Sequence, residues 1–227
     1  MNKSDTKING IVIQWIGHST IGIYGYKIMY IDPFNEVLKG NEKIADIILS
    51  SHGHRDHFDI EAINMLSNEN TTIVHTKGCA TENLKSKKTK VIDSDQKISV
   101  EDIEIYSVHA YNIKRFRDSG EPFHPKGYGV GFIINFDNQI IYYAGDTDYI
   151  DEMNKLQKFN IDIAIVPIGG TYTMDIYDAT NMVKSVNPKI AIPVHYNYIK
   201  GTEADPAIFK DQVEKNNNTQ VIILSHT

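Results

Sequence analysis

Most apolar segments of the chain are short, rich in β-branched and aromatic residues, and bounded by glycine, proline, asparagine or aspartate. Such segments are typical of buried β-strands. Gly25-Tyr26 and Asp137-Asn138 each separate two of them and predict the tips of two hairpins. We expect strands at 11–16, 21–24, 28–31, 44–49, 72–74, 103–108, 128–136, 140–144, 163–167, 190–194 and 221–224.

Three other segments carry helical signals. Asp59 can cap a helix that runs to about Leu66, and its apolar residues recur every third position. Asp175 can cap a second helix, which Asn187-Pro188 would end, and Asp205-Pro206 opens a third with proline at its first position. Many strands come first, and strands then alternate with helices. This order favours an α/β protein whose sheets are packed between helices.

Length and composition agree with one globular domain. The chain has 227 residues, of which 41% are hydrophobic and 23% charged, so we expect a single domain over residues 1–227. The net charge of −6 disfavours nucleic acid as a partner. Cys79 is the single cysteine, which excludes an intramolecular disulfide framework.

The apolar segments also bear on localisation. None approaches the ~18 residues of a transmembrane helix, and residues 1–10 are too polar for a good signal peptide. We therefore expect a cytoplasmic protein without a membrane partner. The sequence leaves open whether the chain forms a homo-oligomer.

The segment between the strand at 44–49 and the helix after Asp59 holds a dense set of donor side chains. Within six residues it contains His52, His54, Asp56 and His57. Neutral imidazole binds zinc and similar divalent ions, and a carboxylate adds an oxygen donor. Gly53 lets the loop fold tightly enough for two rings to turn inward. Four such residues at one strand-to-helix turn have no comparable role in a core.

Three more donor residues lie at the ends of expected strands. His109 follows 103–108, Asp146 follows 140–144, and His195 follows 190–194. In α/β sheets the functional edge is formed by the carboxyl ends of the strands. Together with the cluster these residues make seven donors, enough for two divalent ions. Nitrogen and oxygen donors suit zinc or manganese first, and they also bind iron and nickel.

The seven donors resemble the metal-binding motif of the metallo-β-lactamase superfamily. The resemblance implies a four-layer αβ/βα sandwich, with two mixed β-sheets between outer helices and a dinuclear site at one edge. It implies that one ion is held by His52, His54 and His109, that the other is held by Asp56, His57 and His195, and that Asp146 bridges both. Residues 15–19, 31–34, 167–175 and 192–197 are similar to the branch that includes L-ascorbate-6-phosphate lactonase-like proteins.

This resemblance implies a metal-dependent hydrolase in which a metal-bound hydroxide attacks an ester, lactone or phosphoester. Asp56 or Asp146 could receive the proton. His18 could approach the substrate or donate a proton, or it could be an ordinary loop residue. Asp32 could orient a ligand histidine through its second nitrogen, or it could be a simple turn residue. We expect Cys79 to be a buried packing residue and not a nucleophile, because no base is adjacent in sequence.

The stretch 111–127 bears on the substrate because it follows His109 and is too long for a tight hairpin. Its positive side chains could bind an anionic group of a small substrate, or they could belong to a solvated surface loop. Arg115, Lys126 and Arg117 are the candidates, and His124 could join them.

Two other classes of function are a phosphodiesterase and a non-hydrolytic protein, which could be a di-iron redox protein or a metal-dependent binding module. A phosphodiesterase acting on nucleic acid or phospholipid is known in the superfamily, but the acidic balance and the lack of an amphipathic segment disfavour it. A di-iron redox protein of this superfamily would favour a carboxylate where this chain has His54. A vestigial binding module should have lost some of the seven donors.

Overall fold

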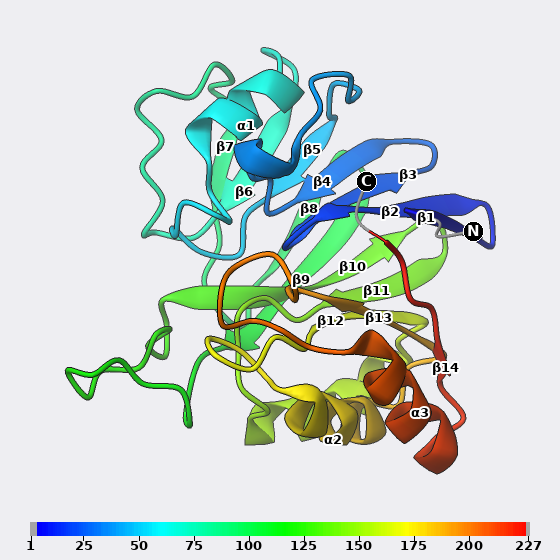
Figure 1. Cartoon of the computed structure of the whole chain (residues 1–227). Helices are drawn as coiled ribbons and strands as arrows, with labels where there is room; N and C mark the ends of the chain where they lie inside the picture. The colour runs from blue at the N-terminus through cyan, green and yellow to red at the C-terminus, as the bar shows by residue number, and fades with distance from the viewer. Residues whose placement is uncertain (1–3, 226–227) are drawn as a thin grey trace.

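The computed structural model describes residues 4–225 and contains two β-sheets of seven strands each (Figure 1). Each half of the chain builds one sheet, with its strands side by side in chain order. The first sheet contains β1 (Asp5–Ile8), β2 (Ile11–Gly17), β3 (Thr20–Tyr24), β4 (Ile28–Ile31), β5 (Ile47–Leu49), β6 (Thr72–His75) and β7 (Thr89–Val91). The second contains β8 (Lys97–Val100), β9 (Ile103–Ala110), β10 (Gly129–Phe136), β11 (Gln139–Tyr143), β12 (Ile163–Pro167), β13 (Ile190–Val194) and β14 (Gln220–Val221).

Both sheets have the same succession of strand directions. In each, the first four strands pair antiparallel, and the last three are added in parallel. It follows that β2, β4, β5 and β6 end at one edge of the first sheet, while β9, β11, β12 and β13 end at one edge of the second. Residues that follow these strands are therefore brought to two edges only.

Helices lie on the outer sides of the two sheets (Figure 1). They are α1 (Ile60–Leu66) on the first sheet and α2 (Ile176–Val186) and α3 (Pro206–Asn216) on the second, with two 3-10 segments, η1 (Asn35–Val37) and η2 (Asp151–Phe159). The side chains of Asp59, Asp175 and Asp205 accept hydrogen bonds from the first turns of the three α-helices, which confirms the predicted caps. The layers confirm the expected sandwich of two mixed sheets between helices.

Strand alternation divides the core of the first sheet between its two faces. In β5, Ile47 and Leu49 belong to the large apolar cluster that the two sheets share. Ile48 points to the opposite face and packs in the cluster that includes Ile63 of α1. Both faces of this strand are thus buried, which is why its sequence is continuously apolar.

The pattern of apolar residues located most strands within one or two positions. Both hairpin tips are confirmed, and Asp137 and Asn138 have φ angles of 52° and 61°, as a tight turn between antiparallel strands requires. The segment 44–49 forms a strand only over β5, and 221–224 only at its start. The sequence analysis missed β1, β7, β8 and η2, because these elements carry many polar or exposed residues. Within residues 4–225, no helix has the length and apolar character needed to cross a bilayer.

Truncation of a central core residue tests this packing. Ile165 of β12 is fully buried, so Ile165→Ala should lower the free energy of unfolding by about 2–5 kcal/mol in urea titrations. Ile208 of α3 is 49% exposed, so Ile208→Ala should change it by less than about 0.5 kcal/mol. Equal losses in the two variants would contradict the assignment of the core.

Candidate metal centre

Seven segments that are distant in sequence meet where the two sheet edges adjoin. Each follows a strand that ends at one of these edges, so the pairing of the strands and the packing of the two sheets bring them together. They are the β2–β3 turn with His18, the residue Asp32 after β4, residues 50–59 after β5, the loop 111–128 between β9 and β10, Asp146 after β11, residues 168–175 after β12, and His195 after β13.

The loop after β5 is compact because Gly53 lies directly against another backbone segment. A Cβ atom at Gly53 would lie 2.4 Å from the carbonyl oxygen of Gly78, which leaves no room for any side chain. The carbonyl of His54 accepts hydrogen bonds from the backbone N–H groups of His57 and Phe58, which closes a turn. The predicted need for glycine thus has a steric cause.

Donor side chains at this edge form two separate groups, and a third set of His52, His57 and Asp146 overlaps both of them. The first group consists of His52, His54 and His124, whose donor atoms all lie within 4.8 Å of one another. The Nε2 atom of His52 is 3.0 Å from Nδ1 of His54.

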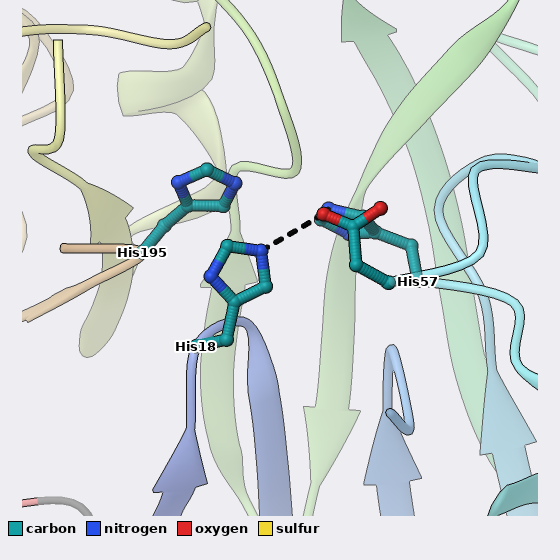
Figure 2. Close-up of side chains that lie close together, drawn as sticks. His18, His57 and His195 are labelled. Carbon is teal, nitrogen blue, oxygen red and sulfur yellow. Dashed lines mark hydrogen bonds and ion pairs between the residues drawn. The ribbon is translucent and has the colours of Figure 1, made fainter. Parts of the chain in front are cut away.

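The second group consists of His18, Asp56, His57 and His195, with the same spread of donor atoms. His18 Nε2 lies 3.0 Å from Asp56 Oδ2, and the rings of His18 and His195 are 4.1 Å apart (Figure 2). These residues come from both halves of the chain.

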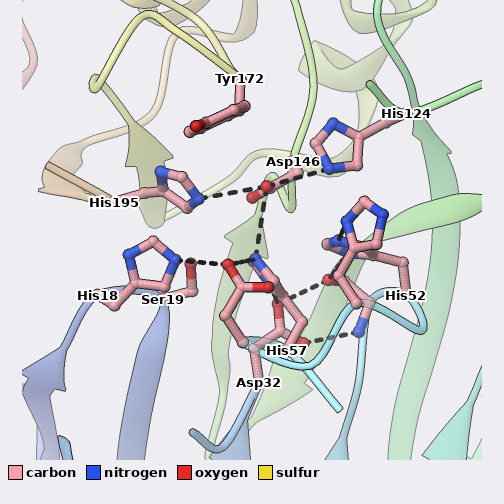
Figure 3. A network of polar contacts seen from close by, with 12 residues as sticks. His18, Ser19, Asp32, His52, His57, His124, Asp146, Tyr172 and His195 are labelled. Carbon is pink, nitrogen blue, oxygen red and sulfur yellow. Dashed lines mark hydrogen bonds and ion pairs between the residues drawn. The ribbon is translucent and has the colours of Figure 1, made fainter. Parts of the chain in front are cut away.

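Asp146 lies between the two groups (Figure 3). Its Oδ2 atom is 3.3 Å from Nε2 of His124, in the first group. The same atom is 3.4 Å from Nε2 of His57 and 3.2 Å from Nε2 of His195, in the second group. One carboxylate is thus within reach of donors on both sides.

Buried partners fix the tautomers of two ligand-type histidines. Asp32 accepts from Nδ1 of His57 at 2.7 Å, which confirms the role anticipated for this aspartate. Its Oδ2 also accepts from the hydroxyls of Ser51 and Tyr143, at 2.6 and 2.7 Å. The single hydroxyl hydrogen of Ser51 is used in the hydrogen bond that Ser51 donates to Asp32. The Ser51 oxygen must therefore accept a hydrogen bond from Nδ1 of His52, 3.0 Å away. In the neutral state His52 and His57 therefore both present the lone pair of Nε2.

These lone pairs face other acceptors. Nε2 of His57 is 3.5 Å from Asp56 and 3.4 Å from Asp146. Within residues 4–225, Nε2 of His57 and both ring nitrogens of His195 are buried without a hydrogen-bond partner. Acceptors that face one another in a buried site require a cation between them. The imidazole and carboxylate donors fit a divalent transition metal there.

The charge states of the imidazoles agree with this arrangement. Burial lowers the pKa of His124 to about 4, burial and the neighbouring His195 lower that of His18 to about 4, and burial lowers that of His52. Neutral imidazole is the form that binds metals. For His57 the effect of burial is outweighed by Asp146 and Asp56, which raise its pKa well above the usual value. In the metal-free chain a proton thus takes the place of the cation.

Residues 12–195 match a family model described as a β-lactamase superfamily domain, and this span contains both groups and Asp146. The chain belongs to the metallo-β-lactamase superfamily. It is 35% identical over 222 residues to a UPF0173 metal-dependent hydrolase from Pelotomaculum thermopropionicum, an alignment that covers 94% of this chain and 96% of the relative.

Solved structures agree with this assignment. A metal-dependent hydrolase from Parabacteroides distasonis is 30% identical, with a TM-score of 0.83 over 97% of this chain and 98% of that one. The metallo-β-lactamase fold protein YhfI from Bacillus subtilis, at 15% identity and a TM-score of 0.70, covers 92% and 89% of the two chains and shares the fold. The protein is thus a metal-dependent hydrolase of the UPF0173 family.

The structure does not bring His109 to the metal centre. The strand β9 continues to Ala110, so His109 still lies within the sheet, beside Val130 of β10. Its Nε2 contacts Asp95 at 3.0 Å, and the ring lines a separate cavity of about 720 Å³ beside η2. His124, which the sequence analysis assigned to substrate binding, occupies the position expected for His109.

Two of the proposed substrate-binding cations also point elsewhere. Arg115 forms ion pairs with Asp148 and Asp175, each at 2.9 Å, and with Asp178. Lys126 pairs with Glu152 at 2.7 Å, away from the donor groups. These ion pairs bind the loop 111–128 to the body of the second sheet.

Arg117 is the substrate candidate that the structure does place at the site. A cavity of about 280 Å³ opens above the donors, and Arg117 is the one lysine or arginine among residues 4–225 that lines it. Its guanidinium lies 4.9 Å from the ring centroid of Phe123, which in turn contacts the ring of Tyr172 edge-on at 4.8 Å. The cavity is lined by His54, Asp56, Arg117, Phe123, His124, Asp146, Tyr172, His195 and Ile199.

His18 does not line this cavity. The ring is fully buried and holds Asp56 from behind, so it meets Asp56 rather than the space for a substrate. The role of substrate contact considered for His18 therefore has no geometric support. Its position in the second group makes it a further candidate donor.

The sequence analysis missed the residues that orient the histidines. Besides Ser51, Asn112 accepts at 2.8 Å from Nδ1 of His124. No spacing rule connects Asn112 with His124, because the loop 111–128 must fold before they meet. His75, left as structural, is buried and bonded to the carbonyl of Thr76, while His226 lies outside the described residues.

Metal content distinguishes His124 from His109 as a ligand. His124→Ala should lower the bound metal measured by elemental analysis, because it removes a donor from the first group. His109→Ala should retain the wild-type content, with an unchanged circular dichroism spectrum in both variants. Loss of metal in His109→Ala with retention in His124→Ala would reverse the assignment.

Cys79 should be inert in the folded protein. It is 8% exposed, and burial raises the pKa of its thiol to about 11, so the reactive thiolate is scarce at pH 8. A thiol reagent such as DTNB should react after unfolding in urea but not before. A cysteine introduced by Asp118→Cys in the exposed part of the loop, in a Cys79→Ala background, should react in the native state. Fast reaction of native Cys79 would contradict its burial.

Proposed function

We propose that the protein uses two divalent metal ions to hydrolyse an ester, lactone or phosphoester of a small anionic substrate. The observation that carries this proposal is the pair of donor groups on either side of Asp146, in which imidazole nitrogens and carboxylate oxygens converge and Nε2 of His57 is buried without a hydrogen-bond partner among the described residues. A single ion held by His52, His57 and Asp146 would leave the other donors of both groups without a cation.

The donor groups suggest how the ions are held. His52, His54 and His124 would bind one ion. The second would be bound by Asp56, His57 and His195, and Asp146 would contact both. We propose zinc or manganese, since nitrogen donors predominate and carboxylates complete each set, and iron or nickel would also fit.

Two bound ions would supply a nucleophilic water at neutral pH and polarise the scissile carbonyl or phosphoryl group. Asp56 and Asp146 line the cavity, so either carboxylate lies where it can hold a proton released during the reaction. His18 keeps Asp56 in place through its hydrogen bond. Tyr172 and Phe123 form the opposite wall and limit the access of water.

The cavity limits the substrate to small molecules with one anionic group near its mouth. About 280 Å³ accommodates a compact metabolite, and Arg117 provides a guanidinium that can bind phosphate or carboxylate through two hydrogen bonds. A nucleic-acid strand would need a row of basic contacts, whereas Arg115 and Lys126 are engaged in ion pairs. The small anionic ester is therefore favoured over a phosphodiester polymer.

Steady-state kinetics of Arg117→Ala tests this assignment. A charge-assisted contact contributes about 1.5–3 kcal/mol, so kcat/KM for phosphorylated lactones or esters should fall by roughly 10- to 100-fold. The matched unphosphorylated esters should be little affected. Lys126→Ala, which removes an exposed cation of the same loop, should leave both reactions unchanged.

Two outcomes would contradict the proposal. Equal losses on charged and uncharged esters would show that Arg117 does not recognise an anion. Faster turnover of bis-aryl phosphodiesters than of all small esters, with metal-loaded wild-type protein, would favour the phosphodiesterase alternative.

A further inference from the structure

Asn112 joins a ligand histidine to the opposite wall of the cavity. This side chain is 5% exposed, and its carboxamide makes three hydrogen bonds within the described structure. Oδ1 accepts from the backbone N–H and from Nδ1 of His124, both at 2.8 Å. Nδ2 donates to the backbone carbonyl of Tyr172 at 3.0 Å.

The chemistry of these partners fixes the orientation of the carboxamide. The Tyr172 carbonyl can only accept, so it must face the NH₂ group of Asn112. The backbone N–H of His124 can only donate, so it must face Oδ1. Rotation of the amide by 180° would break both bonds. The two bonds that show Oδ1, and not Nδ2, to be the atom next to Nδ1 of His124 therefore do not involve the imidazole.

The tautomer of His124 follows from this orientation. Facing an oxygen, Nδ1 must carry the proton in the neutral ring, which leaves the lone pair on Nε2. Nε2 is the atom that lies 3.3 Å from Asp146. Asn112 thus does for His124 what Asp32 does for His57.

The other end of the carboxamide holds a segment that shapes the cavity. Tyr172 belongs to residues 168–175 after β12, and its ring packs against Phe123, the neighbour of His124 in sequence. Figure 3 shows the ring above Asp146, across from His124. One amide therefore connects the donor His124 with the backbone of the wall that would face a substrate.

We propose that Asn112 is a positioning residue that presents Nε2 of His124 to the metal and at the same time fixes the Tyr172 wall. This inference rests on the metal centre of the proposed function. Because each half of the carboxamide has its own task, the two tasks can be separated by substitution.

Asn112→Ala removes both the acceptor Oδ1 and the donor Nδ2, whereas Asn112→Asp removes only the donor. In Asn112→Ala the affinity for one ion should fall by roughly 10- to 100-fold, whereas the ion of the second group should bind as before. Asn112→Asp keeps an acceptor for His124 but loses the donor to the Tyr172 carbonyl. It should restore the metal affinity and still raise KM.

Asn64→Ala is the matched control. Asn64 lies in α1, and its carboxamide also bridges two backbone groups, the carbonyl of Asn83 and the N–H of Lys85. Chelator competition should give wild-type affinity for both ions in this variant. Long-range ¹H–¹⁵N spectra of the metal-free proteins should show the Nδ1–H tautomer of His124 in the wild type and in Asn112→Asp, and its loss in Asn112→Ala.

The outcomes separate this inference from the proposed function. Unchanged metal affinity and tautomer in Asn112→Ala would overturn the role of Asn112, as would a loss of metal in Asn112→Asp as large as in Asn112→Ala. Fewer than two ions in the wild type would overturn the dinuclear proposal instead. The tautomer of His124, measured without metal, would still decide whether Asn112 positions the ring.

Discussion

The protein depends on acceptor atoms that face one another across the junction of its two sheets. Nε2 of His57 lies 3.5 Å from Asp56 and 3.4 Å from Asp146, and Nδ1 of His57 donates its hydrogen bond to Asp32. Such a group is repulsive unless a cation lies inside it. The buried hydrogen bonds behind His52, His57 and His124 therefore do more than pack the core, since they direct the Nε2 lone pairs of these rings inward.

The two halves of the chain contribute to this junction from equivalent positions. An aspartate follows the fourth strand of each sheet: Asp32 in the first half and Asp146 in the second. A histidine lies between the second and third strands of each sheet: His18 in the first half and His124 in the second. The repeated strand order explains why both sets arrive at one edge. The two aspartates nevertheless have different contacts. Asp32 is buried behind His57, whereas Asp146 contacts donors of both groups.

Two arginines of the loop between β9 and β10 have different surroundings: Arg115 is held in ion pairs, whereas Arg117 lines the cavity. Arg115 is held by Asp148 and two further aspartates, and Asp148 also accepts from three consecutive backbone N–H groups of the loop. An arginine whose side chain is only 10% exposed and contacts several carboxylates is strongly oriented, which fixes the path of the chain on either side. Arg117, two residues later, is thereby placed at the cavity, and His124 reaches the donor groups.

The sequence by itself determined the features that depend on neighbouring residues. Apolar runs marked the central strands, Asp59 capped α1, and the spacing around Gly53 identified most of the metal-binding loop. Tertiary structure alone decided that His124 and not His109 joins the donors, and that Arg115 is an internal anchor. The physical reason is that a strand two residues longer than expected, and a loop held by distant carboxylates, set where a side chain points. Those contacts arise only when both sheets have formed.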